Sequence, residues 1–185
     1  MDPRSLRTRR ALQQAALDLG IERPLDEITI GDIAERAGVN RSSFYQHYSD
    51  KETLLADALD AIVEEAGASI EVPMEPTAQP PAGLVDYLHH VDDHAALYRW
   101  ALGSHGSAVV TARLWERVET LVRQHLELAG DASPFDGIPD DVVAAGIAGS
   151  ALGAVRVWLD GEPRADVETA AGWIWRMLLG PAGIA

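Results

Sequence analysis

Residues 29–48, TIGDIAERAGVNRSSFYQHY, constrain the fold of this chain more than any other stretch. Four apolar residues in the first half recur at the spacing of one helix face: Ile30, Ile33, Ala34 and Ala37. Gly38 follows them, and a residue without Cβ can take the left-handed conformation that ends a helix. The pattern predicts a short helix closed by a tight turn.

A second short helix is predicted directly after this turn. Asn40 can cap it, and Phe44 and Tyr48 lie four residues apart, so both point back at the first helix. The outward side chains are then a cation, a hydroxyl, a phenol and an amide, namely Arg41, Ser42, Tyr45 and Gln46. Because such groups recognise phosphates and base edges, the stretch is typical of a DNA-binding helix-turn-helix.

The charge of the whole chain argues against nucleic-acid binding until its distribution is considered. The sequence has 15 Lys and Arg against 29 Asp and Glu, a net charge of −14. Residues 1–51 hold equal numbers of basic and acidic groups, so the excess belongs entirely to residues 52–185. A polyanion repels an acidic region, and we therefore expect residues 52–185 to project away from DNA.

The remaining bulk properties indicate a soluble, cytoplasmic protein. The absence of cysteine excludes disulfides and thiolate metal sites. The charged start, MDPRSLRTRR, leads into no apolar run of the kind that a secretory signal has. The longest nearly uncharged stretch, 142–155, has fourteen residues, which is short for a membrane span and typical of a buried helix.

Periodicity predicts an all-α fold of about nine helices, with no strand-like alternation. Gly20 and Pro24 are expected to stop the first helix, and Ser49 with Glu52 is expected to form a capping box that starts the fourth. The proline-rich residues 69–83 form the only expected linker. The later helices are expected at roughly 84–93, 94–103, 108–129, 140–160 and 166–179.

Residues from about 4 to 59 resemble the DNA-binding domain of the TetR family of bacterial transcriptional regulators. The resemblance rests on the ordered run of TIGDIAERAGV, SSFYQHY and DKETLL. It implies a three-helix DNA-binding domain over residues 1–51, with its helix-turn-helix at 29–48. Residues 52–185 are then expected to form a helical domain for effector binding and dimerisation.

The resemblance also implies which residues touch DNA. The expected contacts are Thr29, Arg41, Ser42, Ser43, Tyr45, Gln46, His47 and Lys51. Among these, Gln46 is expected to read a base, while Thr29 and Lys51 are expected to hold phosphates. Lys51 is also the only lysine of the chain.

Aromatic and histidine side chains gather in the helices that enclose a small-molecule pocket in this family. The candidate ligand-binding residues are Tyr87, His90, His94, Tyr98, Trp100 and Trp115, with His105 nearby; ordinary core packing is the alternative. His90 and His94 share a helix face, but the sequence places no third metal ligand, so we expect no metal and no cofactor. No nucleophile elbow, phosphate loop or cysteine nucleophile is present, so we expect no enzyme.

Small residues in the last two helices indicate close packing. Gly146, Gly149 and Gly153 lie in one helix, and glycine in a helix interior costs about 1 kcal/mol relative to alanine. In the resembled family this helix and the next, here with Trp173 and Met177, form a dimer interface. Close packing within one chain is the alternative.

The expected function is that of a homodimeric regulator, a repressor that a small molecule releases from a palindromic operator. The alternatives are a transcriptional activator and a helical small-molecule or metal-binding protein without an operator. The expected partners are double-stranded DNA, an effector and a second copy of the chain, with no membrane.

Overall fold

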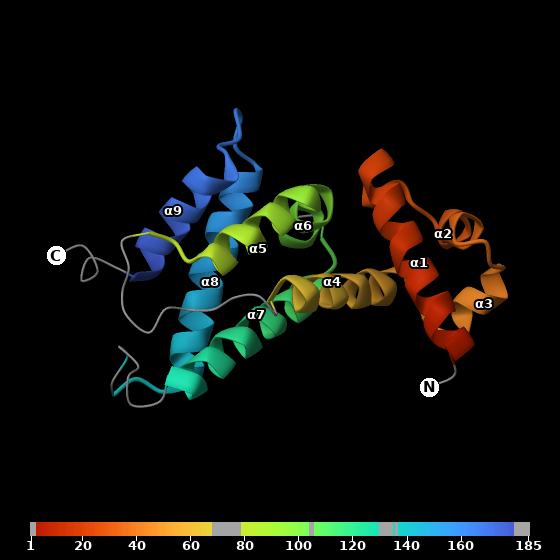
Figure 1. The fold of residues 1–185 in the computed structure, drawn as a ribbon. Coiled ribbons are helices and arrows are strands. Elements are labelled where there is room, and N and C mark those ends of the chain that lie inside the picture. Colours follow the sequence, from red (N-terminus) through yellow and green to blue (C-terminus); the bar gives the residue numbers. More distant parts are fainter. Residues whose placement is uncertain (1–2, 68–78, 104–105, 130–134, 136, 180–185) are drawn as a thin grey trace. The chain divides into compact units, whose positions relative to one another are not determined.

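The computed structural model describes residues 3–67, 79–103, 106–129, 135 and 137–179 (Figure 1). Within these ranges the regular structure is helical throughout, which confirms the all-α prediction. The elements are α1 (Pro3–Glu22), the 3₁₀ turn η1 (Leu25–Glu27), α2 (Ile30–Arg36), α3 (Arg41–Tyr45), α4 (Lys51–Gly67), α5 (Ala82–Asp93), α6 (Ala95–Leu102), α7 (Ala108–Ala129), α8 (Asp140–Leu159) and α9 (Val167–Leu179).

The helices form two compact units. Unit 1 comprises residues 1–62 and 96–114, and unit 2 comprises residues 63–95 and 115–185. This division differs from the expected domains at 51/52, because the first part of α4 and most of α6 cluster with the helix-turn-helix. The functional boundary at residue 51 therefore stays a prediction.

The first helix ends where the sequence indicates, since α1 stops at Glu22, between Gly20 and Pro24. A Cβ on Gly20 would lie 3.0 Å from Leu25 Cδ2, so this glycine allows the close packing of η1. The expected capping box of α4 was wrong. Ser49 and Glu52 do not cap this helix: the backbone N–H of Thr53 donates to Asp50 Oδ1 at 2.7 Å, so Asp50 is the capping residue.

Some expectations fall on residues outside the described ranges. Residues 69–78, most of the expected linker, lie there, and so does His105. The described end of the linker leads into α5, which begins at Ala82 directly after Pro81.

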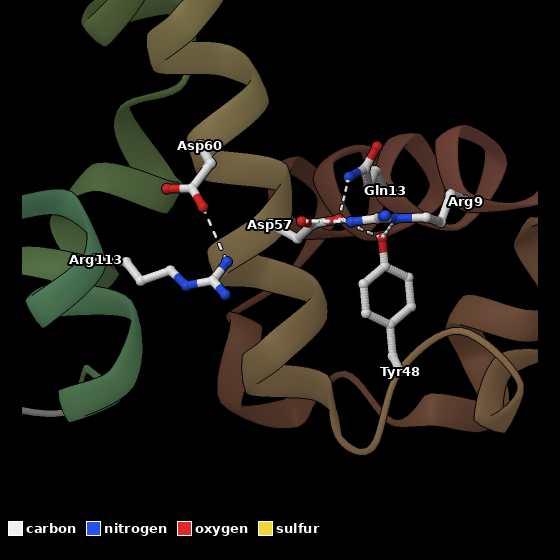
Figure 2. Close-up of polar contacts among 6 residues, drawn as sticks. All are labelled: Arg9, Gln13, Tyr48, Asp57, Asp60 and Arg113. Atoms are coloured by element: carbon white, nitrogen blue, oxygen red, sulfur yellow. Dashed lines mark hydrogen bonds and ion pairs between the residues drawn. The ribbon is translucent and has the colours of Figure 1, made fainter. Parts of the chain in front are cut away.

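The helices of unit 1 are joined by a polar cluster around Asp57 of α4 (Figure 2). Arg9 of α1 donates to both carboxylate oxygens of Asp57, at 2.7 Å to Oδ1 and 2.5 Å to Oδ2. Gln13 Nε2 donates to Oδ2 at 2.7 Å, and the Tyr48 hydroxyl donates to the same oxygen at 2.6 Å. A single carboxylate thus connects α1, the segment after α3 and α4.

Burial and hydrogen bonding shift the titration of this cluster. Burial alone would raise the pKa of Asp57, but hydrogen bonds from Tyr48 and Arg9, with the charge of Arg9, outweigh it and lower that pKa. For Tyr48, burial and its hydrogen bond to Asp57 raise the pKa to about 12. Asp57 is therefore an anion and Tyr48 a neutral donor throughout the physiological range.

Around this cluster lies an apolar core of unit 1. Leu12 of α1, Ile33 of α2, Phe44 of α3 and Leu54 of α4 are fully buried. The Phe44 and Tyr48 rings lie 5.9 Å apart, as the four-residue spacing predicts. The core orients α3 so that its other face is free of the protein interior.

In unit 2, α9 packs against both α5 and α8. Judged by length and composition alone, α8 is long and apolar enough to cross a membrane. The expectation that this segment is too short for a span counted only residues 142–155, whereas the helix has 20 residues. Its buried residues include Val143, Ala148, Leu152 and Trp158, and the indole N–H of Trp158 donates to the Ala165 carbonyl at 2.9 Å. These contacts are those of a core helix.

Replacing Tyr48 by Phe should lower the free energy of unfolding at neutral pH by about 1.5–3 kcal/mol, because a hydrogen bond to a charged acceptor is lost. The folded chain keeps the Tyr48 proton up to a pKa of about 12, whereas the unfolded chain loses it near pH 10. Wild-type stability should therefore fall as pH rises between these values, and the difference between the two proteins should shrink.

Urea unfolding followed by circular dichroism at several pH values between about 7 and 11 measures both effects. Equal alkaline loss of stability in wild type and Tyr48→Phe would contradict the assignment.

Candidate nucleic-acid interface

The turn between α2 and α3 has the geometry that its sequence predicts. Gly38 has a φ of 68°, the left-handed conformation expected of it. Its N–H donates to the Glu35 carbonyl at 3.1 Å, and the Val39 N–H donates to the Ala34 carbonyl at 2.9 Å. This pair of bonds closes the helix in a Schellman motif, which fixes the direction in which the chain enters α3.

Asn40 caps α3, as predicted. Its side-chain oxygen accepts the backbone N–H of Ser43 at 2.8 Å and the hydroxyls of Ser42 and Ser43 at 2.6 and 3.0 Å. Both serine hydroxyl protons therefore point to the cap, which leaves their oxygen lone pairs as acceptors. The two serines hold the start of α3 as well as lying on its exposed side.

The outward face of α3 is exposed, although the helix is shorter than the sequence indicated. α3 ends at Tyr45, because the Phe44 carbonyl accepts from the N–H groups of both His47 and Tyr48, which closes a tight turn. Tyr45 is 59% exposed. Arg41 and Gln46 are exposed too, and neither side chain is hydrogen-bonded to any other part of the chain that the structure describes. These donors are available to a partner.

Thr29 caps α2 in a full capping box. Its hydroxyl donates to Asp32 Oδ2 at 2.8 Å and accepts the Asp32 N–H at 3.2 Å. Hydrogen bonds from the Thr29 backbone N–H and hydroxyl lower the pKa of Asp32 and outweigh desolvation, which would raise it. Arg23 Nη2, 2.9 Å from Asp32 Oδ2, lowers this pKa further. The hydroxyl is thus engaged within the protein, and its expected contact with a phosphate stays a prediction.

The only lysine has a structural partner at this interface. Lys51 Nζ donates to the carbonyls of Leu25 at 2.8 Å and Ile28 at 3.0 Å, which holds η1 against the start of α4. One of its three ammonium protons remains for a phosphate. A substitution of Lys51 would therefore alter both the fold and any DNA contact.

Three other arginines of unit 1 form ion pairs. Arg9 binds Asp57, Arg23 binds Asp32, and Arg36 binds Glu22 at 2.8 Å. Arg7 and Arg10 of α1 are exposed. Unit 1 thus has exposed cations on α1 as well as on α3.

The predicted ligand-binding residues lie in both units. Tyr98 and Trp100 belong to unit 1, where Tyr98 is fully buried and the Trp100 indole N–H donates to Asp26 of η1 at 2.8 Å. Tyr87, His90, His94 and Trp115 belong to unit 2. No bound molecule tests their role as pocket residues, which stays a prediction.

His90 of α5 and His94, which caps the end of this helix, lie with their rings tilted against each other. The His90 and His94 rings are 4.4 Å apart, and His94 Nδ1 lies 3.0 Å from the His90 carbonyl oxygen. His89 Nε2 lies 3.4 Å from Glu168 Oε1 of α9. Among the described residues, no three His, Cys, Asp or Glu side chains are grouped as a metal site requires.

The structure separates the three glycines of α8. A Cβ on Gly149 would lie 3.3 Å from the Trp115 ring, so packing within the chain explains this glycine. A Cβ on Gly146 or Gly153 would meet no atom within 4 Å. An apolar groove of about 640 Å³ runs along this face of α8 and α9, beside Trp173 and Met177, which are 49% and 47% exposed.

Comparison with known proteins agrees with this geometry. Residues 12–58 match the family described as "Bacterial regulatory proteins, tetR family". The chain is 28% identical over 127 residues to the HTH-type transcriptional regulator EthR of Mycobacterium tuberculosis, a match that covers 61% of this chain and 59% of EthR. The chain therefore matches about three-fifths of the length of this relative.

Solved structures share the fold over almost the whole chain. A TetR-family regulator from Syntrophomonas wolfei has a TM-score of 0.70 at 17% identity and covers 94% of this chain and 96% of its own. SmeT, the repressor of a Stenotrophomonas maltophilia multidrug efflux pump, has a TM-score of 0.67 at 15% identity, with 96% and 93% covered. The match of residues 12–58 and the capped, outward-facing α3 place this part of the chain in the TetR family, and the solved structures show that the fold of almost the whole chain is the one such regulators have.

Proposed function

We propose that this chain is a cytoplasmic transcriptional regulator, a repressor that binds operator DNA as a homodimer and is released by a small molecule. The observation that carries the proposal is the exposed face of α3, where Arg41, Tyr45 and Gln46 stand on a helix fixed by the Asn40 cap. Both SmeT, a repressor, and EthR, a transcriptional regulator, support the same class of function.

In this proposal α3 enters the major groove, where each base pair has a distinct pattern of donors and acceptors. Gln46 pairs with a base edge, since its amide is both donor and acceptor. Arg41 and the remaining proton of Lys51 bind phosphates, and the Ser42 and Ser43 oxygens accept hydrogen bonds from bases. The remaining proposed contacts, which are to the DNA backbone, are made by Tyr45, His47 and Thr29.

A second copy is required because one short helix contacts too few base pairs for operator specificity. We propose that the open face of α8 and α9 forms the dimer interface. Gly146 and Gly153 leave space for a neighbouring backbone, while the exposed Trp173, Met177 and Val157 offer apolar area to bury. Burial of such a surface stabilises association by roughly 25 cal/mol per Å² before the costs of ordering.

The proposed effector binds in the region outside the helix-turn-helix. The aromatic and imidazole groups of Tyr87, His90, His94 and Trp115 supply apolar surface with a few polar atoms, which is the composition of ligand pockets. An effector that favours a conformation with weaker DNA affinity releases the operator, and by linkage DNA weakens effector binding by the same factor.

The protein should retard DNA fragments from around its own gene, and the affinity should fall steeply with salt because bound phosphates release counterions. With about six phosphate contacts, the loss between about 50 and 200 mM salt is roughly 10³-fold. A gel-shift titration against an unrelated duplex of equal length measures it. No specific retardation at low salt would contradict the proposed function.

Gln46→Ala should change base preference while leaving stability unaltered, because this exposed side chain is proposed to read a base. Loss of one good base contact costs about 1–3 kcal/mol of discrimination at that position. Sequence selection from a randomised duplex library measures the preference, with Gln14→Ala, an exposed glutamine of α1, as the matched control. Unchanged preference in Gln46→Ala would exclude the base-reading role.

Gly153→Glu should convert the dimer to monomer, because it places a charge on the open face of α8. A Cβ at position 153 meets no atom within 4 Å, so each monomer should stay folded. Gln124→Glu adds the same charge at an exposed position of α7 and should leave the dimer intact. Sedimentation velocity distinguishes the two, and a dimeric Gly153→Glu would rule out this interface.

A further inference from the structure

Gly31, in the first turn of α2, lies beneath the side chain of Arg41 from α3. A Cβ built on Gly31 would be 2.6 Å from Arg41 Nη2, 3.2 Å from Nε and 3.3 Å from Cζ. The guanidinium therefore covers the space that any other residue at position 31 would fill. No sequence pattern singles out Gly31, because it stands within a helix and beside none of the predicted turns.

Backbone conformation does not account for this glycine. Among the described glycines only Gly38 and Gly137 have positive φ, so Gly31 has a conformation that any residue adopts. Alanine at a helix position is favoured over glycine by up to about 1 kcal/mol, which makes Gly31 costly for α2. What the position gains from lacking a side chain is room for Arg41.

The contact matters because the rest of the Arg41 side chain is exposed and flexible. An arginine that is ordered only on binding loses rotamer freedom at that moment, which weakens the complex. With the flat guanidinium lying over Gly31, much of this freedom is already lost in the free protein. Arg41 begins α3, so its guanidinium is then held at the edge of the proposed DNA-binding face.

We infer that Gly31 is a positioning residue for DNA binding. Because Gly31 has no side chain, the Arg41 guanidinium can lie against α2, and this is the orientation in which it contacts DNA. This inference rests on the proposed function, and it adds a residue that itself bonds to no base or phosphate. It predicts that a single methyl group on α2 weakens DNA binding although it does not weaken the fold.

The test is a double-mutant cycle of Gly31→Ala and Arg41→Ala. The probe is a duplex selected by the wild-type protein from a randomised library. Gly31→Ala should weaken binding by about two- to tenfold, the cost of ordering one free arginine. In the Arg41→Ala background the same substitution should have no effect, because no guanidinium remains to be displaced.

Thermal unfolding separates this role from a structural one. The atoms that a Cβ at position 31 would meet belong to the end of the long Arg41 side chain, which can move aside, so Gly31→Ala should leave the melting temperature unchanged or raise it. Unchanged or tighter binding by Gly31→Ala, or an equal loss in both backgrounds, would overturn the inference. Failure of the wild-type protein to select any duplex would instead refute the proposed function.

Discussion

The hydrogen bonds to the Asp57 carboxylate are the interactions on which the structure of unit 1 depends. The carboxylate accepts hydrogen bonds from Arg9, Gln13 and Tyr48, which come from two separate parts of the chain. Because Tyr48 lies in the tight turn after α3, this carboxylate holds the end of α3 to α4 and α1. Removing it would leave the Arg9 cation unpaired in a partly buried site, which is more costly than the loss of the bonds alone.

A consequence is that both ends of α3 are fixed by polar groups while its middle is fixed by Phe44. The Asn40 oxygen accepts the backbone N–H of Ser43 at the start of α3, and the bond from Tyr48 to Asp57 anchors the turn that follows its end. A five-residue helix has little stability of its own, since nucleating a helix is unfavourable. The surrounding contacts therefore supply the rigidity that base recognition requires.

Much of unit 1 followed from the sequence, because its determinants are local. The Gly38 turn and the Asn40 cap depend on residues within a few positions of each other, and both were predicted. The capping box at Ser49 was wrong because Asp50, one residue later, is the stronger acceptor for Thr53. The Asp57 cluster and the covering of Gly31 by Arg41 join distant positions, so no local pattern indicates them.

The glycines of α8 also show that a local sequence pattern does not reveal contacts between distant residues. Sequence alone grouped Gly146, Gly149 and Gly153, whereas the structure places the Trp115 ring against Gly149 and leaves the other two facing open space. The distinction depends on where α7 crosses α8, which periodicity does not give. The sequence pattern of the three glycines therefore has two separate structural causes.

Lys51 gives the molecule a chemical reporter at one defined place. It carries the only side-chain amine of the sequence, and its ammonium is bound to the Leu25 and Ile28 carbonyls. Only a free, deprotonated amine reacts with an acylating reagent, so Lys51 can be acylated only after these two hydrogen bonds break. The rate at which Lys51 is acylated therefore measures how often the connection between α1 and α2 loosens, without any label being introduced.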